Sequence, residues 1–308
     1  MPLDPQAQAV VDAIRARGGP GLHAMTPAQA RATLAAMPRP IGPDVASVVD
    51  WLVPGPSGPV SVRVCTPEGK GPFPAMVWSH GGGWIVGGHN SANAICRRIA
   101  NAVGCIAVSV AYRKAPEHKF PAASEDAYAT VKWLHENGGA INADPARIAI
   151  AGEASGGNVA AAAALMARDR GGPPLVFQLL VSPIIERDFG TDSYRDNGAG
   201  YRLTREMAEW YWTTYLPSDE DATNPYASPI HAESLGGLPP TLVLTPEYDP
   251  LRDDGKKYAA ALKEAGVAVA YSEYAGQIHG FVGMPEEIDR ANDALAEMAA
   301  ALKVAFGS

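Results

Sequence analysis

The sequence predicts an α/β fold in which helices cover both faces of a mostly parallel central sheet. The first observation is a regular alternation, from residue 75 onward, of short apolar runs typical of strands with stretches typical of helices. The second is a strand that runs directly into a glycine-rich turn and a helix of small residues. The third is size, because 308 residues, 47% of them apolar, suffice for one large core.

Charge and hydropathy argue against two classes of partner. The net charge of −8, without a run of lysines and arginines, would repel nucleic acid. The longest apolar stretch is Val159–Ala167, far below the ~20 residues that a membrane-spanning helix needs. We therefore expect neither nucleic acid nor a membrane as a partner.

The N-terminus and the cysteines predict a reducing compartment. The first segment carries Asp4 and Asp12 and has no apolar core, so a secretory signal is not expected. The three cysteines are odd in number and lack metal-site spacing. We expect buried free thiols, no metal site and a cytoplasmic protein; the cysteines are Cys65, Cys96 and Cys105.

Residues 1–44 are predicted to form two N-terminal cap helices. The first has an apolar stripe around Val11. The second opens with Thr26 as N-cap, Pro27 at the first helical position and Gln29 placed for a capping box.

Residues 45–185 and 222–308 are predicted to form the α/β catalytic domain. Helices are expected between its strands, for example over Ala123–His135 and Gly156–Arg168. The expected strands are Val45–Val53, Val60–Cys65, Ala75–Ser79, Cys105–Ala111, Arg147–Ala151, Val176–Val181, Thr241–Thr245 and Val267–Tyr271.

An aromatic insertion over residues 186–221 interrupts this alternation, around a helix that begins near Thr204. In an open α/β sheet, ligands bind beyond the carboxyl ends of the strands. We expect the insertion to cap that site together with the N-terminal helices; the alternative is an ordinary amphipathic helix on the periphery. Its aromatic residues are Tyr201, Trp210, Tyr211, Trp212 and Tyr215.

The glycine-rich turn after the strand near residue 150 has the pattern of a nucleophile elbow. Such a sharp turn needs glycines two residues before and two after its apex. Around Ala154 these positions hold Gly152 and Gly156, whereas around Ser155 the first of them holds Glu153. The apex is therefore Ala154, and the backbone amide of Ser155 is predicted to point into an oxyanion hole at the helix N-terminus.

A second glycine-rich segment, His80-Gly81-Gly82-Gly83-Trp84, directly follows a predicted strand. Three glycines let successive amides converge on one point, as a developing oxyanion requires. Alone, the segment could be a phosphate loop, but it lacks the lysine and Ser/Thr of a P-loop. With an elbow 70 residues later, we interpret it as an oxyanion loop.

An acid and a histidine follow in the chain order nucleophile, acid, histidine. Asp249 lies just beyond the strand Thr241–Thr245, and His279 lies beyond the last strand as the only histidine after that acid. Asp253 and Asp254 suit the first turn of the next helix better than catalysis.

These motifs resemble the hormone-sensitive-lipase-like family of bacterial carboxylesterases, whose elbow reads Gly-Asp/Glu-Ser-Ala-Gly. The resemblance extends from residue 80 to residue 281 and implies an α/β-hydrolase fold with a helical cap. The matching segments are His80–Trp84, Tyr112–His118, Phe120–Ala123, Gly152–Asn158, Asn224–Pro229, Asp249–Asp253 and Ile278–Phe281.

The resemblance implies a Ser-His-Asp hydrolase of small to medium acyl esters that needs no cofactor. Asp249 and His279 become its acid and base, and a homodimer is the assembly that it implies. The implied oxyanion donors are the amides of Gly82, Gly83 and Ser155. We also expect substrate contacts from Trp84, Trp210 and Tyr211.

The departure from the family lies at the elbow, where Ala154 stands in place of serine. We favour a deliberate serine-to-alanine substitution, because drift after loss of function would also erode the acid, the histidine and the glycines. The alternative is a natural pseudo-enzyme that binds an ester-like ligand, and replacement of the nucleophile by Ser155 is disfavoured. Amides, carbamates and lactones remain alternative substrates, since the same apparatus hydrolyses them.

Overall fold

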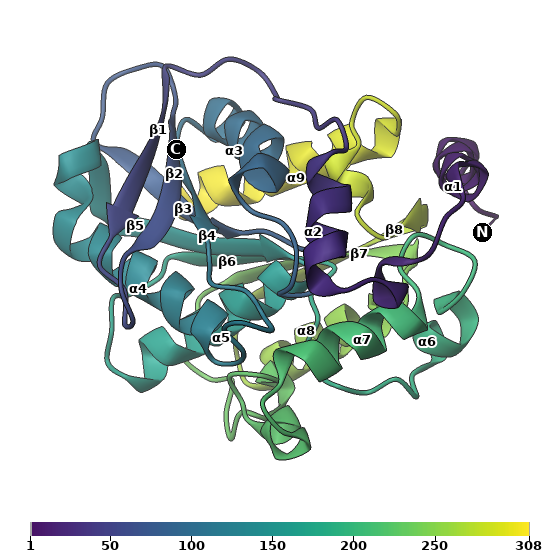
Figure 1. Cartoon of the computed structure of the whole chain (residues 1–308). Coiled ribbons are helices and arrows are strands. Elements are labelled where there is room, and N and C mark those ends of the chain that lie inside the picture. The colour runs from purple at the N-terminus through teal and green to yellow at the C-terminus, as the bar shows by residue number, and fades with distance from the viewer. Residues whose placement is uncertain (1, 308) are drawn as a thin grey trace.

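The computed structural model describes residues 2–307 and contains an eight-stranded sheet with the order β1-β2-β4-β3-β5-β6-β7-β8 (Figure 1). The pairs β1–β2 and β2–β4 are antiparallel, and the others are parallel. The mostly parallel sheet is therefore confirmed. The strands are β1 (Ser47–Val53), β2 (Val60–Thr66), β3 (Phe73–Ser79), β4 (Ile106–Ala111), β5 (Ala143–Glu153), β6 (Phe177–Val181), β7 (Thr241–Tyr248) and β8 (Val269–Ile278).

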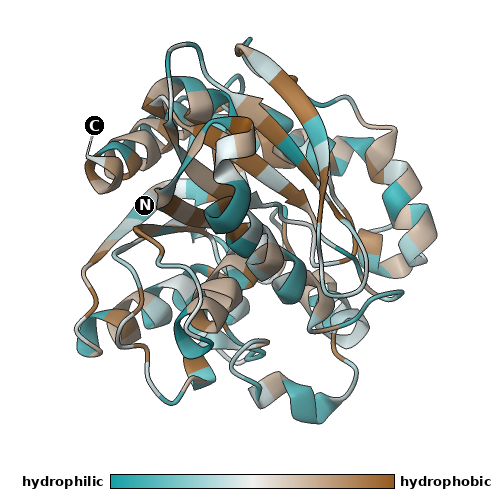
Figure 2. Cartoon of the chain, turned by 90° about the vertical axis from the view of Figure 1, so that its left-hand side faces the viewer, coloured by the Kyte–Doolittle hydropathy of each residue, from teal (hydrophilic) through white to brown (hydrophobic). Residues whose placement is uncertain are grey.

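Helices cover both faces of the sheet, as predicted (Figure 1). α3 (His89–Val103) and α9 (Asp289–Phe306) lie on one face. α4 (Ala122–Asn137), α5 (Ser155–Asp169) and α8 (Arg252–Glu264) lie on the other. The buried residues accordingly form two apolar clusters, and the inner strands between them are largely hydrophobic (Figure 2).

The remaining helices belong to the N-terminal segment and to the insertion. They are α1 (Pro5–Arg17), α2 (Pro27–Ala35), α6 (Asp192–Asn197) and α7 (Arg205–Tyr215). The capping box at the start of α2 is present, and Thr204 caps α7 through a hydrogen bond from the amide of Met207. Single 3-10 turns complete the structure: η1 (Leu22–Ala24), η2 (Gly138–Ile141), η3 (Asp219–Thr223), η4 (Pro229–His231) and η5 (Phe281–Gly283).

The last strand differs most from the sequence prediction. We expected it over Val267–Tyr271, but β8 continues to Ile278. The part beyond Tyr271 begins with Ser272, which is half-buried, and Glu273, which is exposed, because β8 is an edge strand with one open side. Polar residues are tolerated there, so hydrophobicity alone places the end of the strand too early.

Two composition-based expectations can be compared with the structure. The three cysteines are buried and free of disulfide bonds, as predicted. No helix within residues 2–307 is long and apolar enough to cross a bilayer.

Candidate active site

The turn between β5 and α5 has its apex at Ala154, as the glycine spacing predicts. Ala154 adopts φ 52° and ψ −118°, a backbone conformation that residues with a side chain rarely occupy. Its amide donates to the carbonyl of Val181 on the neighbouring strand β6 at 2.9 Å. The structure therefore places position 154 at a strained point between strand and helix.

The two flanking glycines are required by close backbone contacts. A Cβ at Gly152 would collide with the carbonyl of Gly156 across the turn. A Cβ at Gly156 would collide with the carbonyl oxygens of Ser79 and His80, where β3 ends. The elbow therefore packs directly on the start of the second glycine-rich segment.

Ser155 is the first residue of α5, and its side chain is fully buried. Its hydroxyl has no hydrogen-bond partner among the described residues. Its amide lies in the first turn of the helix and has no intrahelical acceptor. Ser155 therefore offers a backbone donor at the helix N-terminus, whereas its hydroxyl points into the interior.

The oxyanion loop, residues 80–84, passes beside the apex. A Cβ at Gly81 would lie 3.5 Å from Cβ of Ala154. Gly82 and Gly83 have φ values of 120° and 59°, which glycine adopts most readily. Within residues 2–307, neither of their amides donates to a backbone carbonyl. The role of these two amides as oxyanion donors stays a prediction, with which the lack of a backbone acceptor is consistent.

His80 supports this loop from the interior. Its ring stacks on Tyr112 at a centroid distance of 4.3 Å, and the Tyr112 hydroxyl donates to the His80 carbonyl at 2.7 Å. Its Nδ1 donates to the carbonyl of Gly81 at 2.7 Å. Burial lowers the pKa of His80 to about 3, so its imidazole stays neutral at ordinary pH.

The sheet register brings Asp249 and His279 together. Tyr248 at the end of β7 pairs with Ile278 at the end of the parallel neighbour β8, so the acid and the histidine are the next residues on adjacent strands. His279 Nδ1 donates to Asp249 Oδ2 at 2.7 Å. Asp249 is fully buried, its Oδ1 accepts the amide of Leu251 at 2.9 Å, and the His279 side chain is 14% exposed.

The other two candidate acids accept backbone amides in or directly before the insertion instead. Both lie in the first turn of α8, as expected. Asp253 accepts the amide of Ser193 at 2.8 Å, and Asp254 accepts the amide of Ile185 at 2.9 Å. Burial raises the pKa of Asp254 well above that of an ordinary carboxyl. The carboxylate paired with the histidine is therefore Asp249.

Both predicted cap segments contact the oxyanion loop or the residue directly after it. The ring of Tyr211, on α7, occupies the space that a Cβ at Gly83 would need. From α2, the Arg31 guanidinium donates to the carbonyls of Ile85 at 2.8 Å and Ala115 at 2.7 Å. Sequence reasoning missed Arg31, because a lone arginine that bonds distant carbonyls leaves no local pattern.

The predicted substrate-contacting aromatics differ in exposure. Trp84 is fully buried and stacks on Tyr215 with centroids 4.0 Å apart. Trp210 is half-buried, and its ring lies 5.3 Å from that of Tyr211. The Trp84 ring thus packs in the interior against the insertion, and the substrate-contact role stays a prediction for all three residues.

Four chemical features therefore meet at one end of the parallel strands. They are a strained apex, unpaired amides, a buried acid–histidine pair and a cover of aromatic residues. No group of three or more His, Cys, Asp or Glu residues within residues 2–307 could hold a metal ion. The arrangement suits nucleophilic attack on a carbonyl once position 154 carries a nucleophile.

Comparison with known proteins identifies similar chains. A family model for the alpha/beta hydrolase fold matches residues 76–283. Carboxylic ester hydrolase LipN of Mycobacterium tuberculosis is 39% identical over 92% of this chain and 77% of LipN.

Two similar solved structures carry a serine-to-alanine change. One is a mutant of LAE6, an alpha/beta hydrolase enzyme from the metagenome of Lake Arreo, Spain, with a TM-score of 0.95, 35% identity and 99% coverage of both chains. The other is a mutant of esterase rPPE complexed with (S)-Ac-CPA, with a TM-score of 0.95 and 35% identity over 99% of this chain and 98% of that one.

Gly156→Ala tests the close approach of the elbow to the oxyanion loop. We expect the free energy of unfolding to fall by about 1–3 kcal/mol, because the new methyl group meets fixed carbonyl oxygens. Gly139→Ala is the matched control, since no atom lies within 4 Å of its Cβ position. Urea unfolding measures both variants, and equal stabilities would contradict the packing described here.

Proposed function

Because the chain belongs to the alpha/beta hydrolase family, we propose that it is a carboxylic ester hydrolase whose nucleophile position holds alanine. The observation that carries the proposal is the hydrogen bond of 2.7 Å between His279 and the buried Asp249, beside an elbow with its apex at Ala154. The relative LipN is named a carboxylic ester hydrolase, which supports the same activity. The proposed substrate is a small-molecule ester with a small to medium acyl group.

The proposed mechanism needs the hydroxyl oxygen of a serine at position 154, which this chain lacks. With serine at position 154, Nε2 of His279 takes the hydroxyl proton, while Asp249 holds Nδ1–H and stabilises the imidazolium. The serine oxygen attacks the ester carbonyl, and the amides of Gly82, Gly83 and Ser155 stabilise the oxyanion. His279 then protonates the leaving alcohol, and water releases the acid from the acyl-enzyme with His279 as base.

Ala154 removes the nucleophile and leaves the other parts in place. In subtilisin, such a loss costs about 10⁶ in turnover, equivalent to about 8 kcal/mol of barrier. The residual catalysis comes from the oxyanion donors and from binding. The chain as it stands is therefore proposed to bind esters and to turn them over very slowly.

We propose that alanine at 154 is a deliberate substitution for serine. A side chain at φ 52° and ψ −118° costs about 1–3 kcal/mol, and glycine would relieve that cost. A natural binding protein needs no side chain at position 154, so glycine there would stabilise it. A designed serine-to-alanine change, in contrast, keeps the strained conformation that serine requires. Similar solved chains carry serine-to-alanine changes, which adds support. A natural pseudo-enzyme is the alternative.

The cap is proposed to consist of residues 1–44 and 186–221, with the catalytic domain formed by residues 45–185 and 222–308. The contacts of Tyr211 with Gly83 and of Arg31 with Ile85 support this division, because each segment contacts the oxyanion loop or the residue directly after it. A cover of this kind limits the length of the acyl or alcohol group. Amides, carbamates and lactones would meet the same apparatus.

Ala154→Ser tests the proposal directly. We expect p-nitrophenyl acetate and butyrate hydrolysis to rise far more than about tenfold, since the restored nucleophile recovers several kcal/mol of barrier. A fluorophosphonate probe should label the serine variant and leave the unchanged chain unlabelled. A gain below that threshold would exclude the proposed mechanism.

Ala154→Gly is the matched control for the apex. It should stay inactive and unlabelled, because it adds no nucleophile. We expect its free energy of unfolding to be about 1 kcal/mol higher than that of the alanine chain, since glycine adopts this backbone conformation without strain. A destabilised glycine variant would show that the apex is not strained.

The acyl-chain preference of Ala154→Ser tests the cap. Each extra methylene gains only about 0.8 kcal/mol from burial, and a closed cover opposes that gain by steric exclusion. We therefore expect hydrolysis to favour short p-nitrophenyl esters. A rate that climbs steadily from C4 to C16 acyl chains would indicate an open groove instead.

A further inference from the structure

A segment of the insertion, residues 200–202, contacts His279 and the residue that precedes Asp249. The Arg202 guanidinium donates through Nη1 to the carbonyl of His279 at 3.3 Å and to that of Gly280 at 3.1 Å. The ring of Tyr201 lies 5.1 Å from that of Tyr248, the residue before Asp249. One short segment therefore bridges the ends of β7 and β8.

The turn after His279 leaves space for the guanidinium group of Arg202. Gly280 has φ 74°, which favours glycine. The position that its Cβ would take is filled by the Arg202 guanidinium, whose Cζ would lie 3.0 Å away. Gly280 is thus needed both for the turn and for the approach of Arg202.

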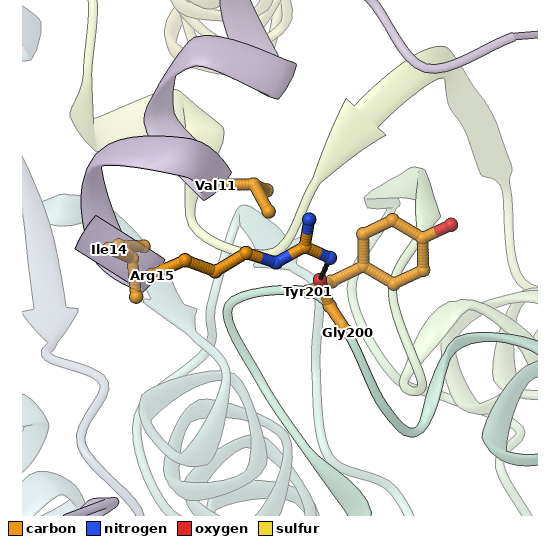
Figure 3. Close-up of a pocket in the computed structure, with 5 residues that line it drawn as sticks. All are labelled: Val11, Ile14, Arg15, Gly200 and Tyr201. Carbon is orange, nitrogen blue, oxygen red and sulfur yellow. Dashed lines mark hydrogen bonds between the residues drawn. The ribbon is translucent and has the colours of Figure 1, made fainter. Parts of the chain in front are cut away.

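The segment is also fixed at its other end. Arg15, on α1, donates through Nη2 to the carbonyl of Gly200 at 2.8 Å (Figure 3). Beside this bond lies a hollow of about 110 Å³ lined by Val11, Ile14 and Tyr201. The Arg15 hydrogen bond therefore connects this segment to α1.

We propose that Arg202 is a positioning residue for His279, an inference that rests on the proposed function. It bonds to backbone carbonyls of the turn, so it acts on the imidazole through the orientation of the peptide that carries it. A charged donor forms stronger hydrogen bonds than a neutral one, and two acceptors in succession fix that peptide. The cap is in this way connected to the proton-transfer group.

The expected consequence is a selective loss of turnover. Without Arg202 the turn samples more orientations, and the imidazole spends less time bonded to Asp249 and aimed at position 154. Misplacement of a reacting group by about 1 Å can cost 10²-fold in rate. Because these two bonds are partly exposed, we expect a smaller loss, about tenfold in kcat, with KM changed less than about twofold.

The kinetic test uses Ala154→Ser as the background with p-nitrophenyl butyrate as substrate. Arg202→Ala should lower kcat with KM nearly unchanged, and Arg202→Lys, which retains a charged donor, should recover part of the loss. Arg205→Ala is the matched control, because Arg205 lies on the same insertion and forms its ion pair with Glu209 on its own helix. An unchanged kcat in Arg202→Ala, or an equal loss in the control, would overturn the proposal.

A second test is independent of esterase activity and uses the unchanged Ala154 chain. The Nδ1 proton shared between His279 and Asp249 should give a low-field NMR resonance that persists in Arg205→Ala and is lost or broadened in Arg202→Ala. A resonance of equal intensity in both variants would overturn the positioning role. If Ala154→Ser is inactive, the proposed function fails, and this spectrum still decides the role of Arg202.

Discussion

The strained backbone at Ala154 is the constraint on which the rest of the site depends. A strand can pass into a helix without an intervening loop only if one residue takes a conformation such as φ 52° and ψ −118°. That turn places Ala154 directly before Ser155, the first residue of α5, whose amide has no intrahelical acceptor. It also forces the backbone at Gly156 against the carbonyls where β3 ends, which brings the oxyanion loop beside the apex.

The acid–histidine pair follows from a different constraint, the parallel register of β7 and β8. Residues 249 and 279 follow a registered pair, so their side chains emerge together at the carboxyl edge of the sheet. The sheet fixes where each strand ends but not how the following turn is oriented. Residues 200–202 and the N-cap of α8 supply that orientation, through Arg202 on one side and the amide of Leu251 on Asp249 on the other.

The sequence predicts the parts of the site that follow from local patterns or from chain order, and it does not predict the contacts between distant segments. The apex at Ala154 and the pair Asp249–His279 could be predicted, because turn glycines and chain order are local or ordered patterns. The contacts of Arg31 and Arg202 could not, since each joins segments more than 50 residues apart. The full burial of Trp84 was also missed, because its stacking on Tyr215 depends on how the insertion docks.

We propose that the site is organised for the transition state of ester hydrolysis and lacks only the serine oxygen. An enzyme directs its interactions to the transition state and holds the ground-state ester weakly. Calorimetry should therefore show that Ala154→Ser binds a tetrahedral boronate analogue at least ~10²-fold tighter than the Ala154 chain binds the matched ester. Nanomolar binding of an ester by the Ala154 chain, with no preference of the serine variant for the boronate, would contradict the account and indicate a binding protein.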